Sequence, residues 1–365
     1  MKKVLFAATV DSHIKQFHLP YLQWFKEQGY EVHVATNGDE EIPYCDIKHR
    51  IPFERNPIKV NNLKAIKKLK KIIENEKFEL IHCHTPMGSV ITRLASKKSR
   101  KKFNTKVIYT AHGFHFYKGA PLLNWIIYYP IEKILSNITD CLITINEEDY
   151  EIAKRKLKTK KITLVHGVGV DFSKFNFEMS EEEKIALKEN LGLRKNDYII
   201  IYPAELSKRK NQEMLLKAID LLKKDNYKNI RVLLPGIDSM NGKYEKIAKR
   251  LNIEKDIRFL GYRNDIPKLM KISDLAVSTS KQEGLPVNII EAMMANLPII
   301  ATDCRGNRDL VGEKNIVKIN NEKMLKEKIE EIYKKGRVAE KYENLKIFEK
   351  NEVLKCMEEI YEEYI

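Results

Sequence analysis

"KQEGLPVNIIEAMMANLPIIATD", residues 281–303, is the stretch of sequence that decides the fold of this chain. It predicts a loop, then a helix at 287–295, then a strand at 299–302, which is half of a parallel β–α–β repeat. Pro286 suits a first helical position because it has no N–H to leave unpaired, and Asn296 is typical of a helix end. The whole chain repeats this order of elements.

Short runs of β-branched residues alternate with helical patterns almost from end to end. Strands are expected at residues 4–9, 31–35, 80–83, 107–110, 141–145 and 162–165, and again at 198–202, 232–234, 257–260, 275–278, 299–302 and 317–319. Helical patterns fall between them, as at 19–28, 63–74, 89–96 and 123–136. Short apolar strands that alternate with helices specify parallel sheets covered on both faces.

The two series of strands predict two domains. Residues 171–196 contain no strand pattern, so the boundary is placed near Asp171. We expect a Rossmann-like domain at 1–170, a second at 171–345, and a C-terminal helix at 346–365 that packs back toward the first. Ligands of open parallel sheets bind beyond the carboxyl ends of the strands. Two doubly wound α/β domains that face each other would therefore place the site in a central cleft.

Charge and composition narrow the classes of function. The formal net charge of +15 clusters in lysine-rich segments at 64–71, 97–102 and 154–161, which indicates an anionic partner or a solvated surface. No nucleic-acid motif accompanies the lysines, so an anionic membrane surface is favoured over nucleic acid. No apolar run reaches the length of a membrane span, and the N-terminus predicts a strand rather than a signal peptide.

The cysteines and carboxylates predict no metal site. The five cysteines are scattered and never form a C-x-x-C pair, which favours reduced thiols in the cytosol. No D-x-D triplet occurs, nor any His/Cys/carboxylate cluster with the sequence spacing of ligands. We therefore expect neither a metal ion nor a cofactor.

Two carboxylates in the opening stretch suggest a ligand. Gly284 and the helix start offer free backbone N–H groups to an anion such as phosphate. Glu283 can accept hydrogen bonds from hydroxyl groups beside that anion, and Glu291 is costly inside the helix unless two ribose hydroxyls pair with it. The ligand described is a nucleotide sugar. The alternative is that Glu291 is an exposed helix residue and Glu283 a loop charge.

Four motifs, in order along the chain, resemble a known family. They are "TAHGFHFY", "VHGVGVDFSKF", "RFLGYRNDIPKLM" and "EGLPVNIIEAMMANLPIIATD". The last looks like the E-x7-E signature of family-4 retaining glycosyltransferases, which have the two-domain GT-B fold. Together with "HIKQFHLPYL" and "INEEDY", they are similar to capsular and exopolysaccharide enzymes of bacteria.

The resemblance implies roles for individual residues. Glu283 would face the donor sugar, Glu291 the ribose, and Lys210 the diphosphate. His112 would lie near the reacting sugar; the alternative is a structural hydrogen-bonder. The resemblance also assigns donor binding to two loops, Gly261-Tyr262-Arg263 for the nucleobase and Gly284-Leu285-Pro286 around the helix start. His13, His18 and His115 are weaker candidates, structural or on the acceptor side.

The chain departs from the family at the donor phosphates. The usual diphosphate arginine falls at Glu205, where Lys208 or Arg209 could substitute. The aromatic helix at 122–135 could touch lipid, but its spacing favours a core-facing helix.

These observations together predict a cytosolic hexosyltransferase, peripheral on the inner face of the membrane and independent of metal. It would move a sugar, such as an N-acetylhexosamine, from a UDP-sugar to a glycan on a polyprenyl diphosphate. The resemblance to the retaining family implies same-face attack assisted by the leaving phosphate. The alternatives are a UDP-sugar epimerase on the same fold, a non-catalytic sugar-binding protein and a nucleic-acid-binding protein.

Overall fold

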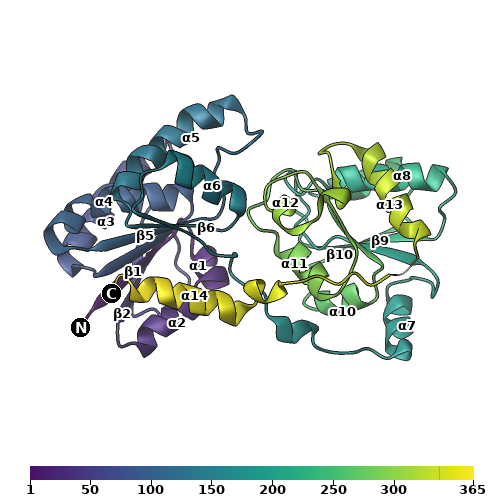
Figure 1. The fold of residues 1–365 in the computed structure, drawn as a ribbon, viewed down its shortest axis with the longest axis horizontal. Helices are drawn as coiled ribbons and strands as arrows, with labels where there is room; N and C mark the ends of the chain where they lie inside the picture. Colours follow the sequence, from purple (N-terminus) through teal and green to yellow (C-terminus); the bar gives the residue numbers. More distant parts are fainter. Residues whose placement is uncertain (337) are drawn as a thin grey trace. The chain divides into compact units, whose positions relative to one another are not determined.

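The computed structural model describes residues 1–336 and 338–365, which form two compact units. Unit 1 comprises Met1–Gly169 and Asn351–Ile365, and unit 2 comprises Val170–Lys350. The chain therefore returns to unit 1 at its C-terminal end, and both termini lie on that unit (Figure 1).

Unit 1 is built on a seven-stranded parallel sheet in the order β3-β2-β1-β4-β5-β6-β7. The strands are β1 (Lys3–Ala7), β2 (Glu31–Thr36), β3 (Ile47–Arg50), β4 (Leu80–His84), β5 (Lys106–Ala111), β6 (Cys141–Thr144) and β7 (Lys161–Leu164). Val4 pairs with Val32 on one side and Leu80 on the other. The strand order reverses between β1 and β4, and this switch point is where ligands of such sheets bind.

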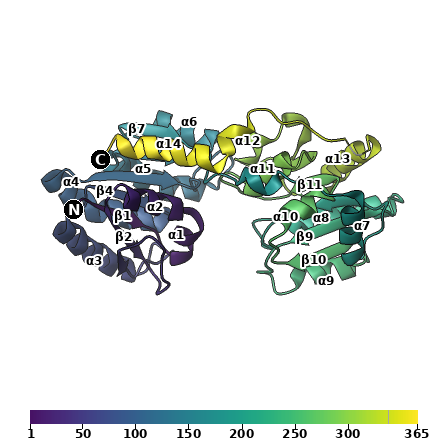
Figure 2. The same cartoon turned by 90° about the horizontal axis from the view of Figure 1, so that it is seen from below.

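Helices cover both faces of the unit 1 sheet (Figures 1 and 2). They are α1 (Asp11–Phe17), α2 (Leu19–Glu27), α3 (Asn61–Glu76), α4 (Pro86–Phe103), α5 (Leu122–Leu135), α6 (Glu147–Lys156) and α14 (Lys350–Glu362), with a 3-10 turn at Ser136–Ile138. Side chains alternate along a strand, so Phe6 packs with α2 and α14 while Leu5 packs with α3 and α4. The two apolar layers drive the packing of the helices onto the sheet.

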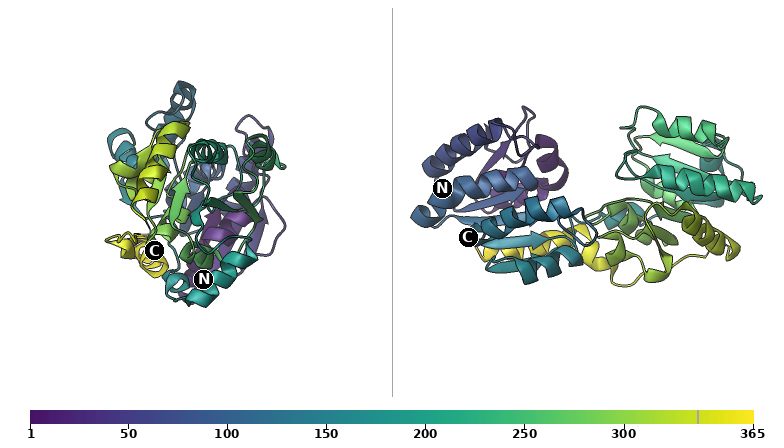
Figure 3. Two further views of the ribbon diagram at one scale, coloured as in Figure 1. Left: turned by 90° about the vertical axis from the view of Figure 1, so that its right-hand side faces the viewer. Right: turned by 90° about the horizontal axis from the view of Figure 1, so that it is seen from above.

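Unit 2 repeats the architecture with six parallel strands in the order β10-β9-β8-β11-β12-β13 (Figure 3). The strands are β8 (Tyr198–Ile201), β9 (Ile230–Pro235), β10 (Ile257–Gly261), β11 (Leu275–Ser278), β12 (Ile299–Thr302) and β13 (Ile316–Val317). The helices are α7 (Glu181–Asn190), α8 (Gln212–Lys224), α9 (Lys243–Arg250), α10 (Ile266–Lys271), α11 (Val287–Met294), α12 (Asn307–Leu310) and α13 (Glu322–Lys334), with 3-10 turns at Phe172–Phe175, Glu313–Asn315 and Leu345–Phe348. The switch point of this sheet lies between β8 and β11.

The two predicted parallel sheets are confirmed, with differences at the ends of elements. The short polar strand β3 and the short helix α1 were not predicted, because neither has a long apolar pattern. Pro286 is the residue before α11 rather than its first residue. Asn296 ends the same helix with a left-handed φ of 55°. No helix in the described ranges is both long and apolar enough to cross a bilayer.

Helix α5 faces the core, as predicted, but with one of its two apolar faces only. Its aromatic side chains do pack against the apolar layer under α3 and α4. Its aliphatic side chains do not, since Leu122 is 75% exposed, Ile126 62% and Ile134 68%. The helix is apolar on both faces, so its spacing alone could not show that only the aromatic face is covered.

Candidate functional site

The loops that follow β8 and β11 are bound to each other at the switch point of unit 2. The Tyr202 and Ser280 hydroxyls are hydrogen-bonded at 2.8 Å, and the Lys281 amide donates to the Arg209 carbonyl at 2.8 Å. The Thr279 hydroxyl donates to the Asn211 carbonyl at 2.9 Å. Adjacent parallel strands bring their carboxyl ends to the same edge of the sheet, so these loops form one site.

Lys210 and Glu283 form the centre of this site. Lys210 Nζ lies 2.6 Å from Glu283 Oε1, which also accepts a hydrogen bond from the Ser280 hydroxyl at 2.5 Å. Arg209 Nη1 donates to Glu283 Oε2 at 3.0 Å. The Glu283 side chain is only 7% exposed and that of Arg209 48%. Two cations therefore converge on one buried carboxylate, and both remain close enough to solvent to meet an incoming anion.

A buried arginine fixes the loop that leads into α11. Arg305 Nε donates to the Glu283 carbonyl at 3.1 Å, and the Arg305 side chain is buried. Gly306 has a φ of 77°, and a Cβ there would lie 2.3 Å from the carbonyl oxygen of Gly284. Only glycine permits this approach. The backbone of Gly284, Leu285 and Pro286 is thus supported from behind by the β12–α12 turn.

Glu291 lies in the second turn of α11 and is partly buried. Its carboxylate has no hydrogen-bond partner within residues 1–336 and 338–365, and burial raises its pKa to about 7 despite the nearby charge of Lys174. A desolvated carboxyl without a partner is costly. Vicinal hydroxyl groups of a ligand would satisfy it.

The predicted base-binding loop follows β10. Gly261 has a φ of 61°, Tyr262 is 72% exposed, and Arg263 Nε donates to Asp265 Oδ1 at 2.7 Å. The exposed tyrosine ring offers an apolar face to an aromatic base. Among the described contacts, neither this loop nor Glu291 bonds to the Lys210–Glu283 pair, so the structure joins only part of the predicted donor set.

Glu205 does not take part in the Lys210–Glu283 cluster. It is exposed and accepts a hydrogen bond from Ser239. Lys208 is exposed and has no described side-chain partner, whereas Arg209 contacts Glu283 directly. Of the two substitutes weighed for the missing arginine, the geometry favours Arg209.

His112 belongs to unit 1, where it follows β5 and lies in a histidine cluster. The His13 ring lies 4.8 Å from the His112 ring, and the His18 and His84 rings stack at 3.7 Å. Candidate ligand atoms of these four histidines all lie within 4.8 Å of one another. His115 lies outside the cluster because its ring stacks on Tyr128 instead.

Burial keeps the cluster neutral. It lowers the pKa of His13 to about 3, that of His112 to about 4, and those of His18 and His84 well below the usual value. Both ring nitrogens of His18 and His84, and Nε2 of His13 and His112, lack a hydrogen-bond partner in the described structure. Neutral imidazoles can accept protons from hydroxyl groups or ligate a transition metal such as zinc.

Sequence spacing could not show this cluster, because its members come from α1, the residue after α1, β4 and the loop after β5. The H-x-H triplet in "IHCHTP", which contains His84, was the available signal. A second group that could hold a metal ion consists of Glu31, His33 and Glu76. Both glutamates already form ion pairs with Lys3, and His33 Nε2 lies 2.6 Å from Glu31 Oε1.

Comparison with known proteins agrees with this architecture. The family described as "Glycosyl transferases group 1" matches residues 183–351, and "Glycosyl transferase 4-like" matches 3–146. EpsD of Bacillus subtilis (strain 168), classed as a glycosyltransferase, is 46% identical over 341 residues, or 92% of this chain and 88% of that relative. This chain belongs to the glycosyltransferase family.

A second sequence relative and a solved structure are also similar to this glycosyltransferase. An Escherichia coli protein named UDP-Gal:alpha-D-GlcNAc-diphosphoundecaprenol alpha-1,3-galactosyltransferase is 29% identical over 262 residues, or 70% of this chain and 66% of that relative. Among solved structures, Anabaena HepE in complex with UDP and glucose superposes with a TM-score of 0.76 at 18% identity, covering 100% of both chains. The glycosyltransferase therefore has the predicted GT-B fold.

Proposed function

We propose that this glycosyltransferase is a retaining family-4 enzyme. It transfers a hexose, such as an N-acetylhexosamine, from a UDP-sugar to a glycan carried on a polyprenyl diphosphate. The product belongs to surface-polysaccharide synthesis. The enzyme works in the cytoplasm at the inner face of the membrane, without spanning it.

The Lys210–Glu283 pair at the unit 2 switch point carries this proposal. The 2.6 Å ion pair holds a cation where a diphosphate would meet the start of α11. Glu283 would face the sugar, and the unsatisfied Glu291 carboxyl would accept the ribose hydroxyls. The exposed Tyr262 ring would stack on the base.

Two cations would stabilise the leaving diphosphate. Lys210 and Arg209 both reach Glu283, so either can turn to a developing phosphate charge without large reorganisation. Arg209 would thereby substitute for the diphosphate arginine of the family, whose position is occupied by Glu205 in this chain. His112, neutral at pH 7, would lie beside the reacting sugar as a hydrogen-bond acceptor.

The relatives support the donor and the acceptor class. The Escherichia coli relative is named for a UDP-linked donor and a diphosphoundecaprenol acceptor, and HepE was solved with UDP and glucose. The lysines exposed on α3 and α4 are suited to the anionic membrane surface in which such an acceptor resides.

The test is a panel of nucleotide sugars assayed with and without a polyprenyl-diphosphate-linked acceptor. We expect free UDP and a longer glycan only when donor and acceptor are both present. Interconversion of the donor sugar without acceptor would instead indicate an epimerase, and donor binding with no turnover would indicate a sugar-binding protein.

Metal independence has its own test. We expect activity to persist in excess EDTA, because lysine, arginine and helix N–H groups stabilise the phosphates. Loss of activity in EDTA with recovery on adding magnesium or manganese would contradict this part of the proposal.

A further inference from the structure

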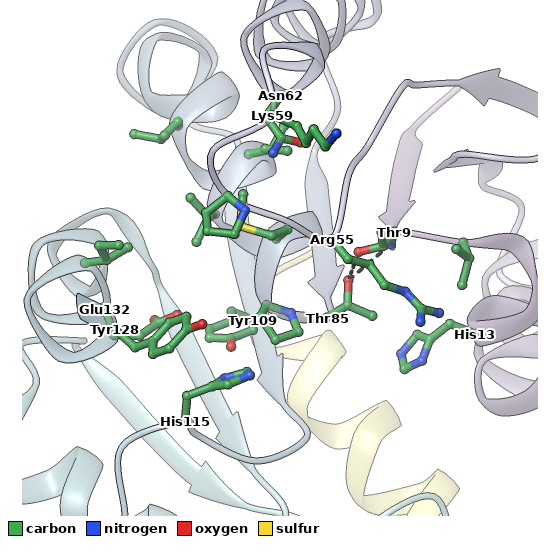
Figure 4. Close-up of a pocket in the computed structure, with 18 of the residues that line it drawn as sticks. Thr9, His13, Arg55, Lys59, Asn62, Thr85, Tyr109, His115, Tyr128 and Glu132 are labelled. Atoms are coloured by element: carbon green, nitrogen blue, oxygen red, sulfur yellow. Dashed lines mark hydrogen bonds between the residues drawn. The ribbon is translucent and has the colours of Figure 1, made fainter. Parts of the chain in front are cut away.

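Unit 1 contains a large groove between α1, α3, α4 and α5 (Figure 4). Its volume is about 820 Å³, which is within the range of pockets that bind small organic molecules. The groove opens at the carboxyl ends of β1, β4 and β5, so it begins at the switch point of the unit 1 sheet.

The walls of the groove are aliphatic and remain partly open to solvent. Leu63 is 62% exposed, Leu94 42%, Ile127 41% and Ile131 37%, although all four line one cavity. They come from α3, α4 and α5, and Met87, Val90 and Ile91 extend the wall along α4. An exposed apolar surface of this kind marks a binding site for an apolar partner.

One end of the groove is polar and cationic. In Figure 4 the side chain of Arg55 points toward His13, beside Thr9 and Thr85. The hydroxyl oxygens of these threonines lie 2.6 Å apart. Neither Arg55 nor Lys59, which also lines the groove, has a side-chain ion pair in the described part of the chain. Arg55 lies at this polar end, whereas Lys59 lies beside Asn62 at the α3 side of the groove (Figure 4). An unpaired arginine at one end of an apolar groove matches a lipid with an anionic head.

This polar end reaches the histidine cluster. His13 lines the groove, and its ring lies 4.8 Å from that of His112. A head group held by Arg55 would therefore lie close to the histidine that the proposed function places beside the reacting sugar. The apolar walls of the groove extend from this polar end away from the histidine cluster.

The floor of the groove is held by a buried ion pair. Arg93 on α4 donates to both carboxylate oxygens of Glu132 on α5, at 2.8 and 2.9 Å, and its guanidinium lies 4.1 Å from the centre of the Tyr109 ring. A bidentate pair of this kind fixes two helices in one geometry. The groove is thus built into the fold between α4 and α5.

We propose that this groove binds the isoprenoid chain of the polyprenyl diphosphate acceptor, with Arg55 on its diphosphate. The inference rests on the proposed function and names the part of the acceptor that unit 1 recognises. The groove has room for the isoprene units next to the diphosphate, and the rest of a long chain stays in the bilayer. A lipid head group alone would leave the aliphatic walls uncovered, so the isoprenoid chain is the better occupant.

A photoreactive probe tests the groove without any sugar transfer. We expect a benzophenone derivative of farnesyl diphosphate to label peptides of α3, α4 and α5 saturably, and polyprenyl diphosphate to compete. Labelling outside these helices, or no saturable labelling, would overturn the inference. Groove labelling in a protein that transfers no sugar would instead count against the proposed function alone.

Steady-state kinetics of matched variants, measured in detergent, give a second test. Each variant is assayed with two acceptors: one linked to a polyprenyl diphosphate, and a soluble one linked to a short alkyl diphosphate. Ile127→Asp should raise KM for the polyprenyl acceptor about tenfold to a hundredfold, while KM for the soluble acceptor and for the donor is unchanged. Ile134→Asp, which is 68% exposed on the same helix α5 but lies outside the groove, is the control.

A second groove variant tests whether the effect of Ile127→Asp is caused by misfolding. Leu63→Asp changes a different helix and should show the same pattern, with thermal unfolding close to wild type. Equal effects of Ile127→Asp and Leu63→Asp on both acceptors would overturn the inference, as would no effect on either.

Discussion

Lys210 and Glu283 satisfy each other's charge across 2.6 Å, although 73 residues separate them in sequence. The pair is nearly buried, with side chains 13% and 7% exposed, and Ser280 and Arg209 complete the bonds of the carboxylate. A buried carboxylate needs such partners. The cations that neutralise Glu283 are also those proposed to meet the donor diphosphate, so one arrangement stabilises the loop and prepares the site.

We therefore expect Lys210→Met to lower kcat by about a hundredfold to a thousandfold, because a preorganised positive charge at the leaving phosphate is lost. Thermal unfolding of unit 2 should also shift down, since Glu283 keeps only Arg209 and Ser280 as partners. Steady-state kinetics with saturating acceptor measure the first effect and calorimetry the second.

Variants of the two neighbouring cations can show which of them substitutes for the missing arginine. Arg209→Gln should lower kcat about tenfold or more, whereas Lys208→Gln, which alters an exposed side chain without described partners, should behave like wild type. The reverse order of effects would assign the second cation to Lys208.

Glu291 should cost stability in the free protein. Its pKa is raised from 4.5 to about 7 by burial, so the folded state holds more protons than the unfolded state between these pH values. Unfolding free energy then falls as pH rises through that window. Glu291→Gln cannot ionise and should be more stable than wild type at pH 8, by about 1–3 kcal/mol, with no difference below pH 4.5.

The same substitution should weaken donor use. Loss of the charged acceptor for two ribose hydroxyls should lower kcat/KM for the donor about tenfold to a hundredfold at pH 8. In wild type, donor affinity should rise as pH passes 7 and the carboxyl ionises, and the variant should lack this rise. Normal donor kinetics in folded Glu291→Gln would remove the ribose assignment.

Sequence patterns predicted the parts of this protein that depend on local order. The strands were visible because apolar runs such as Ile199 to Ile201 are buried on both faces, and Glu283 and Lys210 because they stand in motifs. The histidine cluster and the groove depend on side chains from separate elements that meet only in the folded unit. Helix α5 shows the same limit, because periodicity does not say which of two apolar faces is covered.

The histidines predict that unit 1 is the acid-sensitive part of the chain. All nine lie within residues 1–169. Burial lowers the pKa of His13 and His82 to about 3 and that of His112 to about 4, from 6.5. The unfolded state therefore binds more protons below pH 6.5, so the stability of unit 1 is present above that value and is lost as pH falls toward 4.

Tryptophan fluorescence can follow this loss selectively. The two tryptophans, Trp24 and Trp125, both lie in unit 1. We expect the urea midpoint of unit 1, followed by tryptophan fluorescence, to fall as the pH is lowered from 6.5 to 4.5. The urea midpoint of unit 2, followed by hydrogen exchange of β8 and β11, should fall less. His18→Phe should reduce the pH dependence, and His115→Gln, outside the cluster, should not. A pH-independent midpoint would contradict the buried, neutral cluster.

The last prediction concerns the lysines of α3. Lys67, Lys68, Lys70 and Lys71 are all exposed, on the helix whose Leu63 and Ile66 line the groove. Each cation near an anionic bilayer contributes about 1 kcal/mol, and the attraction fades over a Debye length of about 8 Å at physiological salt. We expect cosedimentation with anionic but not neutral vesicles, reversed by high salt.

Substitution of these four lysines by glutamine should impair vesicle binding and leave donor affinity unchanged, because the donor residues lie in unit 2. The matched control replaces four exposed basic residues of α9, Lys243, Lys246, Lys249 and Arg250, and so removes the same charge from unit 2. If both quadruple variants lose binding equally, net charge alone attracts the protein to membranes. If the α3 variant binds like wild type, its lysines form only a solvated face, and the acceptor must be reached through the groove without electrostatic docking at α3.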